Sequence, residues 1–207
     1  MTAPVLVKIC GLTRLEDALA AARLGADWVG FNFWPRSRRY IAPEAAAAIV
    51  AALPASVLPV GVFVDPGAAE LARAIQVSGV RTVQLHGDEP PALCAAVPVP
   101  VVKGIRVRDA HSLAALAAYE VSAFLLDSAT PGYGGSGTGF DWALAAEIAA
   151  DVPLWLAGGL TPENVAEAVR RVRPRGVDVA SGVESTPGVK DWKRMEAFIR
   201  NAKAAAS

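Results

Sequence analysis

Short apolar segments of this sequence end, one after another, in a polar residue or a glycine. Two of these ends carry groups that can exchange protons with a substrate: Cys10 follows the segment 5–9, and Asp127 follows the segment 123–126. A single such end could simply mark the point where the chain turns polar again. The repetition of the pattern along the whole chain instead predicts one site that many segments build together.

Lys8 precedes Cys10 by two residues within an apolar segment. Side chains alternate between the two faces of a β-strand, so the two residues are expected to share one face. A thiol reacts as its thiolate, which a free cysteine with a pKa of about 8.5 forms only to a small extent at neutral pH. Because a neighbouring ammonium group favours the thiolate, we expect Lys8 to lower the pKa of Cys10.

The elements that must position these groups alternate between strand and helix. Runs rich in β-branched residues predict eight strands, at 5–9, 28–31, 58–64, 80–85, 101–105, 123–126, 154–157 and 177–180. Apolar residues at helical spacing predict helices at 15–24, 43–53, 68–77, 113–119, 143–149, 163–172 and 192–202, with a further short helix around Cys94. Three glycines fall where helices should end and are expected to adopt the left-handed C-cap conformation: Gly25, Gly79 and Gly176.

Eight successive strand–helix units without a linker predict an α/β fold, a single-domain (β/α)8 TIM barrel over residues 1–207. A doubly wound sheet is the alternative, but it rarely uses so many short parallel strands in succession. In a barrel the catalytic groups lie at the carboxyl ends of the strands and in the loops that follow, which is where Cys10 and Asp127 stand.

Charge and hydropathy exclude several classes of partner. Lys plus Arg and Asp plus Glu number 20 each, so no global field favours nucleic acid. No apolar run reaches the roughly 20 residues that a membrane helix requires, and the amino terminus has no pattern of a secretory leader. We expect a cytoplasmic protein, a monomer or a homodimer, in which Cys10 and Cys94 are free thiols.

Eight segments, in order along the chain, resemble the signature segments of the phosphoribosylanthranilate isomerase family. They are 8–13 (KICGLT), 35–41 (PRSRRYI), 60–64 (VGVFV), 83–89 (VQLHGDE), 125–128 (LLDS), 134–142 (GGSGTGFDW), 156–164 (LAGGLTPEN) and 176–184 (GVDVASGVE). A Gly-Gly pair after one strand is common among barrels, whereas eight collinear matches are specific. The resemblance implies an isomerase of tryptophan biosynthesis that acts on a small phosphoribosyl substrate.

The resemblance also implies the roles of two residues: Cys10 is expected to be the general base and Asp127 the general acid. The implied reaction is an Amadori rearrangement, in which protonation of the ring oxygen opens the ribose to an iminium ion and loss of the C2' proton gives an enolamine. Proton transfer alone suffices for this chemistry, and no cluster in the sequence has the spacing of metal ligands. We therefore expect neither a cofactor nor a metal.

Substrate binding is expected at the strand ends and in the loops after them. Barrels of this kind commonly hold phosphate with the loops after the seventh and eighth strands, which here carry Gly158, Gly159, Ser181 and Gly182. Arg39 matches the arginine that the family uses for the anthranilate carboxylate, although Arg36 and Arg38 are close enough in sequence to compete for that role. The remaining candidates for the pocket wall are Lys8, His86 and Asp178.

Two alternative functions stay open at this point. One is the related isomerisation of a phosphoribosyl aminoimidazole in histidine biosynthesis, alone or as a second activity, against which Cys10 argues because two aspartates are expected there. The other is a non-catalytic binder that keeps only the phosphate loops, which retention of both Cys10 and Asp127 disfavours. The glycine-rich segment 129–139 beside Asp127 is interpreted as a loop able to close over substrate, since a dinucleotide site would need an acidic residue after the next strand.

Overall fold

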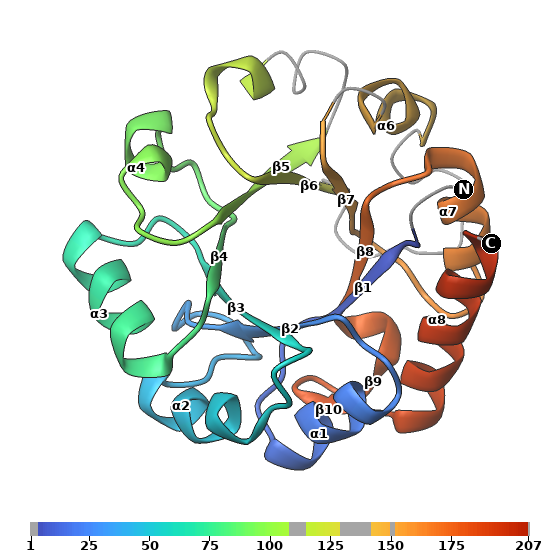
Figure 1. Cartoon of the computed structure of the whole chain (residues 1–207), viewed down its shortest axis with the longest axis horizontal. Coiled ribbons are helices and arrows are strands. Elements are labelled where there is room, and N and C mark those ends of the chain that lie inside the picture. Colours follow the sequence, from blue (N-terminus) through green and yellow to red (C-terminus); the bar gives the residue numbers. More distant parts are fainter. Residues whose placement is uncertain (1–3, 108–114, 129–141, 150–151, 207) are drawn as a thin grey trace.

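A computed structural model of the chain describes residues 4–107, 115–128, 142–149 and 152–206. Eight parallel strands close into a barrel in sequence order, with helices around it (Figure 1). The strands are β1 (Leu6–Ile9), β2 (Trp28–Asn32), β3 (Leu58–Phe63), β4 (Thr82–Leu85), β5 (Val101–Val107), β6 (Ala123–Ser128), β7 (Leu154–Leu156) and β8 (Gly176–Val179). All eight predicted strands, and the barrel itself, are confirmed.

The outer layer consists of helices that follow the strands. They are α1 (Leu15–Arg23), α2 (Pro43–Ala52), α3 (Ala68–Ser78), α4 (Pro91–Ala95), the 3-10 helix η1 (Ala115–Ala118), α6 (Trp142–Ala149), α7 (Val165–Val172) and α8 (Trp192–Ala205). The main apolar core lies between these helices and the outward faces of the strands. No described helix is long and apolar enough to cross a lipid bilayer.

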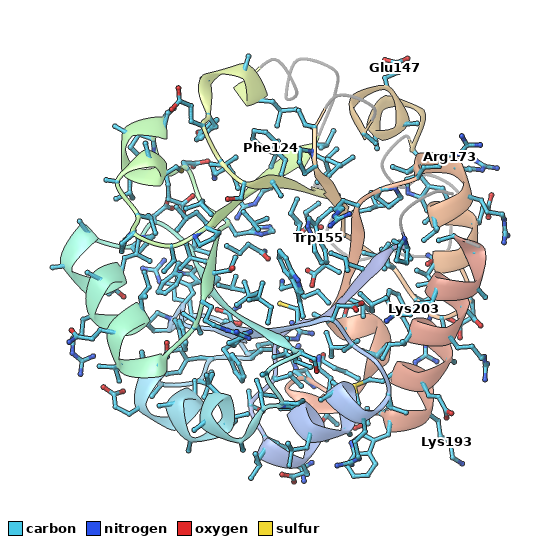
Figure 2. All side chains as sticks on the ribbon, viewed as in Figure 1. Phe124, Glu147, Trp155, Arg173, Lys193 and Lys203 are labelled. Atoms are coloured by element: carbon cyan, nitrogen blue, oxygen red, sulfur yellow. The ribbon has the colours of Figure 1, made fainter. Side chains whose placement is uncertain are left out.

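A separate apolar cluster fills the inside of the barrel. Trp28 of β2 and Trp155 of β7 pack with ring centroids 4.2 Å apart, and Val102 and Leu125 join them. Figure 2 shows Trp155 inside the ring of strands, whereas Arg173, Lys193 and Lys203 lie at the periphery. The cluster fills the barrel below its mouth, the end formed by the carboxyl ends of the strands. The polar groups at the mouth therefore pack against a rigid apolar layer.

Several predicted helix ends are wrong. Residues 115–118 form a 3-10 helix instead of an α-helix, and residues 108–114 lie outside the described part of the chain. Helix α7 begins at Val165, two residues late, because Asn164 bonds back through Oδ1 to the N–H of Thr161 at 2.8 Å. Gly176 does not end a helix but begins β8, where a Cβ atom would lie 2.6 Å from Cζ3 of Trp155.

The connection from β8 to α8 contains structure that the sequence did not predict. A 3-10 turn, η2 (Ser181–Val183), leads into a short antiparallel hairpin of β9 (Glu184–Thr186) and β10 (Val189–Lys190). Asp191 then caps α8 by accepting hydrogen bonds from the N–H groups of Lys193 and Arg194. Asp17 of α1 accepts from the N–H of Lys190 at 3.1 Å, so the hairpin is fixed against the start of the chain.

Candidate active site

Cys10 and Lys8 face the inside of the barrel together, as their spacing predicts. The ammonium nitrogen Nζ of Lys8 lies 3.3 Å from Sγ of Cys10 and 3.0 Å from Oδ1 of Asp178 on the neighbouring strand β8. The parallel register that places Lys8 opposite Asp178 fixes this arrangement. All three side chains are buried, which makes a compact ionic cluster at the end of β1.

Lys8 lowers the pKa of Cys10 in the expected sense, but the net pKa of the thiol is raised. Burial raises the pKa of the Cys10 thiol, and the negative charge of Asp178 adds to that effect. Lys8 acts in the predicted sense but does not outweigh them. For Lys8 itself, burial opposes the charge, yet Asp178 and Cys10 together raise its pKa, so Lys8 stays an ammonium ion.

A second buried cation near Cys10 comes from the unpredicted hairpin. Lys190 of β10 also lowers the pKa of the thiol through its charge, although burial lowers its own pKa. Its Nζ donates to Oε1 of Glu184 at 2.9 Å and to the carbonyl oxygen of Ala180 at 3.1 Å. No local pattern of the sequence marks Lys190 and Glu184, because only the hairpin brings them beside β1.

Arg39 reaches the site from the loop after β2 and pairs with Glu184 in a two-pronged contact. Its Nε lies 2.8 Å from Oε1 and its Nη2 lies 2.6 Å from Oε2 of the same carboxylate. The side chain also covers Gly11, where a Cβ atom would collide with Cδ of Arg39. Arg36 and Arg38 are exposed, so the structure favours Arg39 among the three arginines.

Asp127 lies at the end of β6 in a more open position. Its carboxylate oxygen Oδ2 is 3.2 Å from Nε2 of His86, which follows β4, and 31% of its side chain is exposed. The His86 loop is held by a buried ion pair in which Lys103 of β5 binds Glu89 at 2.8 Å. Glu89 in turn accepts hydrogen bonds from the N–H of Gly87, so the backbone next to His86 is fixed.

Gln84, which was not predicted to belong to the site, links the side of the barrel mouth that carries Cys10 (the thiol side) to the side that carries Asp127 (the carboxyl side). Its Oε1 accepts from Nζ of Lys8 at 2.7 Å, and its Nε2 lies 2.8 Å from Nδ1 of His86. Strand alternation could have found it, since Gln84 precedes His86 by two residues. A continuous series of contacts therefore runs from Cys10 to Asp127.

The loops after β7 and β8 lie against each other at the same end of the barrel. Gly158 and Gly159 have φ values of 82° and 70°, in the left-handed region that favours glycine. A Cβ atom on Gly182 would collide with the carbonyl oxygen of Leu160. Ser181 is exposed, so its hydroxyl group is accessible to a ligand. The two loops thus bring together the four residues predicted to bind phosphate. Their backbones come so close that a side chain at Gly182 would not fit between them.

A hollow of about 1100 Å³ lies at the opposite end of the barrel, next to the residues that precede the strands. It contains none of the predicted site residues, and its lining includes Val5, Pro153, Arg173 and Arg175. Within the described residues, no group of three or more His, Cys, Asp or Glu side chains could hold a metal ion. The glycine-rich segment 129–139 lies outside the described residues.

Comparison with known proteins points to one family. A family model described as N-(5'-phosphoribosyl)anthranilate (PRA) isomerase matches residues 7–201. A protein of that name from Myxococcus xanthus is 49% identical over 205 residues, covering 97% of each chain. One from Geobacter sulfurreducens is 51% identical over 200 residues, covering 96% of this chain and 98% of its own.

Solved structures of the same family also resemble this chain over nearly its whole length. Phosphoribosyl anthranilate isomerase from Thermotoga maritima matches with a TM-score of 0.91 and 46% identity, covering 97% of this chain and 99% of that one. A structure of the enzyme in complex with reduced 1-(o-carboxyphenylamino)-1-deoxyribulose 5-phosphate matches with a TM-score of 0.88 and 43% identity, with the same coverage. These similarities favour neither the histidine-pathway alternative nor a non-catalytic binder.

Proposed function

Because the chain belongs to the N-(5'-phosphoribosyl)anthranilate isomerase family, we propose that Cys10 and Asp127 carry out the two proton transfers of the family's reaction. The chain is an isomerase of tryptophan biosynthesis that converts N-(5'-phosphoribosyl)anthranilate to 1-(2-carboxyphenylamino)-1-deoxyribulose 5-phosphate. The observation that carries the residue assignment is the convergence of both groups on one mouth, joined through Lys8, Gln84 and His86.

The acid step belongs to Asp127. Its protonated carboxyl group gives its proton to the ring oxygen of the ribose, and the bond from C1' to that oxygen breaks as the nitrogen lone pair forms an iminium ion. Asp127 is left as a carboxylate, beside Nε2 of His86. Because part of the side chain is exposed, the carboxylate can regain a proton from water after each turnover.

The base step belongs to Cys10. Its thiolate takes the proton from C2', and the electron pair of the broken bond neutralises the iminium ion to give an enolamine, which becomes the ketone. Burial makes the free thiolate costly, so this step needs cations nearby. Lys8 and Lys190 supply two, and the iminium ion itself places a third positive charge next to the sulfur.

The remaining residues bind the ends of the substrate. We expect the backbone N–H groups of Gly159 and Gly182 and the hydroxyl group of Ser181 to donate to phosphate; the left-handed φ of Gly158 and the close approach of Leu160 to Gly182 support this. Oδ1 of Asp178 pairs with Lys8 at 3.0 Å, and because a carboxylate oxygen has more than one acceptor position it can also accept a hydrogen bond from a sugar hydroxyl.

Arg39 is suited to the anthranilate carboxylate because its guanidinium group already holds a carboxylate in bidentate fashion. The substrate would compete with Glu184 for this group. Glu184 keeps a second partner in Lys190, so it does not become an unpaired buried charge when Arg39 turns to the substrate.

Activity measurements on Cys10→Ala and Asp127→Asn test the assignment, followed by the change in fluorescence as the anthranilate substrate is consumed. We expect kcat to fall by about 10²- to 10⁴-fold in each variant, the usual contribution of a positioned acid or base. Cys94→Ala is the matched control, because Cys94 is buried in α4 and we expect full activity. Full activity of either Cys10→Ala or Asp127→Asn would remove that residue from the mechanism.

We further propose that residues 1–207 act as one catalytic domain in the cytoplasm, as a monomer or a homodimer. The single closed barrel formed by all eight strands supports one domain. Light scattering of the purified protein tests the oligomeric state, and a mass above that of two chains would contradict it.

A further inference from the structure

His86 can carry its proton on either ring nitrogen, and the groups around it decide which. Nε2 faces Oδ2 of Asp127 from β6 at 3.2 Å, and Nδ1 faces Nε2 of Gln84 at 2.8 Å. Gly104 of β5 lies against the ring, since a Cβ atom there would come within 2.7 Å of Nδ1. The ring is therefore held between three strands and has one polar partner on each nitrogen.

The orientation of the Gln84 amide follows from Lys8. An ammonium group has only hydrogens to offer, so the atom of Gln84 that it contacts at 2.7 Å must be the carbonyl oxygen. The NH₂ group of the amide then faces His86, and Nδ1 must accept from it. A neutral imidazole that accepts at Nδ1 carries its hydrogen at Nε2, which points to Asp127.

We propose that Gln84 is a positioning residue for the acid step: it fixes His86 as the neutral Nε2–H tautomer and so directs one N–H group at Oδ2 of Asp127. The other neutral tautomer is disfavoured, because its Nδ1–H would face the NH₂ group of Gln84 with two donors in contact. The ammonium group of Lys8, 76 residues away in sequence from Gln84, thus fixes which atom donates and which accepts in each hydrogen bond from Gln84 to Asp127.

This orientation has a consequence for the acid. When Oδ2 of Asp127 accepts from His86, the proton of the acid form stands on Oδ1, the oxygen free to face the substrate. After that proton has moved to the ribose, the same N–H group stabilises the carboxylate that remains. The inference rests on the proposed acid role of Asp127, but the state of His86 can be measured without activity.

Other charged groups near the ring do not change this assignment. Lys8 and Asp178 lie on the side of Gln84 that faces away from His86. The ion pair of Lys103 with Glu89 lies on the outer side of β4 and β5. Arg106, two residues after Gly104 on β5, is exposed. Among the described residues of the neighbouring loops, Asp65 and Asp88 are joined through the N–H of Asp88 and Oδ1 of Asp65.

Nitrogen NMR of the full chain with ¹⁵N-labelled histidine tests the proposal. The sequence has only two histidines, so a His111→Gln variant assigns the spectrum. We expect the neutral ring of His86 to show a hydrogen on Nε2 and none on Nδ1. A neutral ring with its hydrogen on Nδ1 in the unsubstituted protein would overturn the proposal.

Gln84→Glu is the decisive variant, because a carboxylate accepts from both Lys8 and His86 while keeping the shape of the side chain. We expect a hydrogen on Nδ1 of His86 and a fall in kcat of about tenfold with a KM changed less than about twofold, since the wrong protonation of a positioned histidine impairs proton transfer. If the Nδ1 signal of His86 in Gln84→Glu were the same as in the unsubstituted protein, the proposal would be contradicted.

Two further variants separate positioning from folding. Gln76→Glu makes the same chemical change on the exposed face of α3 and should leave the His86 spectrum and kcat unchanged. Gln84→Met removes the amide without adding charge, and we expect a mixture of both His86 tautomers. If the Gln84→Glu protein does not fold, the Gln84→Met spectrum decides: a pure Nε2–H tautomer there would show that Gln84 does not set it. The Asp127→Asn assay is independent of these spectra, so failure of the acid assignment and failure of this inference are distinguishable.

Discussion

The thiol side and the carboxyl side of the mouth are built in different ways. Cys10 lies near Lys8, Asp178 and Lys190; burial raises the pKa of its thiol, and the charges of these groups act directly on that pKa as well. Asp127 is partly open to water, and among the described residues its carboxylate contacts His86, whose loop is held by the buried ion pair of Lys103 and Glu89. Charged neighbours therefore act directly on the pKa of the proposed base, whereas the proposed acid depends on the orientation of one histidine ring.

The largest expected effect concerns the support of the carboxyl side. Lys103→Met leaves Glu89 as an unpaired buried charge, and we expect a loss of about 3–5 kcal/mol in the free energy of unfolding, measured by urea titration. Arg73→Met, which removes an ion pair with Glu44 on the surface, is the control and should not change the urea midpoint measurably. Equal effects of the two variants would mean that the buried pair does not hold the His86 loop.

The next effect concerns the thiol side. Lys8→Met removes the larger of the two cationic influences on Cys10 and should raise the pKa of the thiol further. We expect alkylation of Cys10 by iodoacetamide at neutral pH to slow by about tenfold, because the rate follows the thiolate fraction. Peptide mass spectrometry separates Cys10 from Cys94. An unchanged rate at Cys10 would mean that burial alone sets its reactivity.

Arg39→Lys keeps the positive charge but loses the planar fork that matches a carboxylate. If Arg39 binds the anthranilate end, KM should rise about fivefold, or about 1 kcal/mol, with kcat nearly constant. The fluorescence assay provides both constants. A fall in kcat at constant KM would instead place Arg39 with the reacting atoms.

The smallest effect is on acid stability. Burial opposes the charge of Glu184, but Arg39 and Lys190 outweigh it, so the pKa of Glu184 lies below its ordinary value of 4.5. A carboxyl group with a lowered pKa in the folded state stabilises the fold above its ordinary pKa, and this contribution is lost as the pH falls through the lowered value. Glu184→Gln should therefore lose less stability between pH 7 and about pH 3 than the unsubstituted protein, as measured by urea midpoints. A steeper loss in the variant would reverse this sign.

Local patterns in the sequence were sufficient to predict the strands and the residues that point inward from them. Alternation placed Lys8 with Cys10 and correctly set both on the barrel interior, and the strand ends marked His86 and Asp127. Helix ends were less predictable. Gly176 looked like a C-cap, but its lack of a side chain makes room for Trp155, a contact between β7 and β8 that no local pattern contains.

The parts of the site that could not be predicted depend on closure of the barrel. Lys8 meets Asp178 only because β1 pairs with β8, and Lys190 approaches Cys10 only through the hairpin after β8. The net direction of the Cys10 pKa was missed for the same reason, since it depends on burial by distant segments. Strand alternation could have placed Gln84 on the barrel interior, but the orientation of its amide group follows only from the contact with Lys8.

The late position of the hairpin in the chain also bears on biosynthesis of the protein. Cys10 leaves the ribosome well before Asp178, Glu184 and Lys190, which follow it by more than 160 residues. Until those residues emerge and β8 pairs with β1, the nascent chain presents an uncovered thiol without its ionic partners. A buried thiol is far less open to oxidation than an exposed one, so completion of the barrel both assembles the base and shields it.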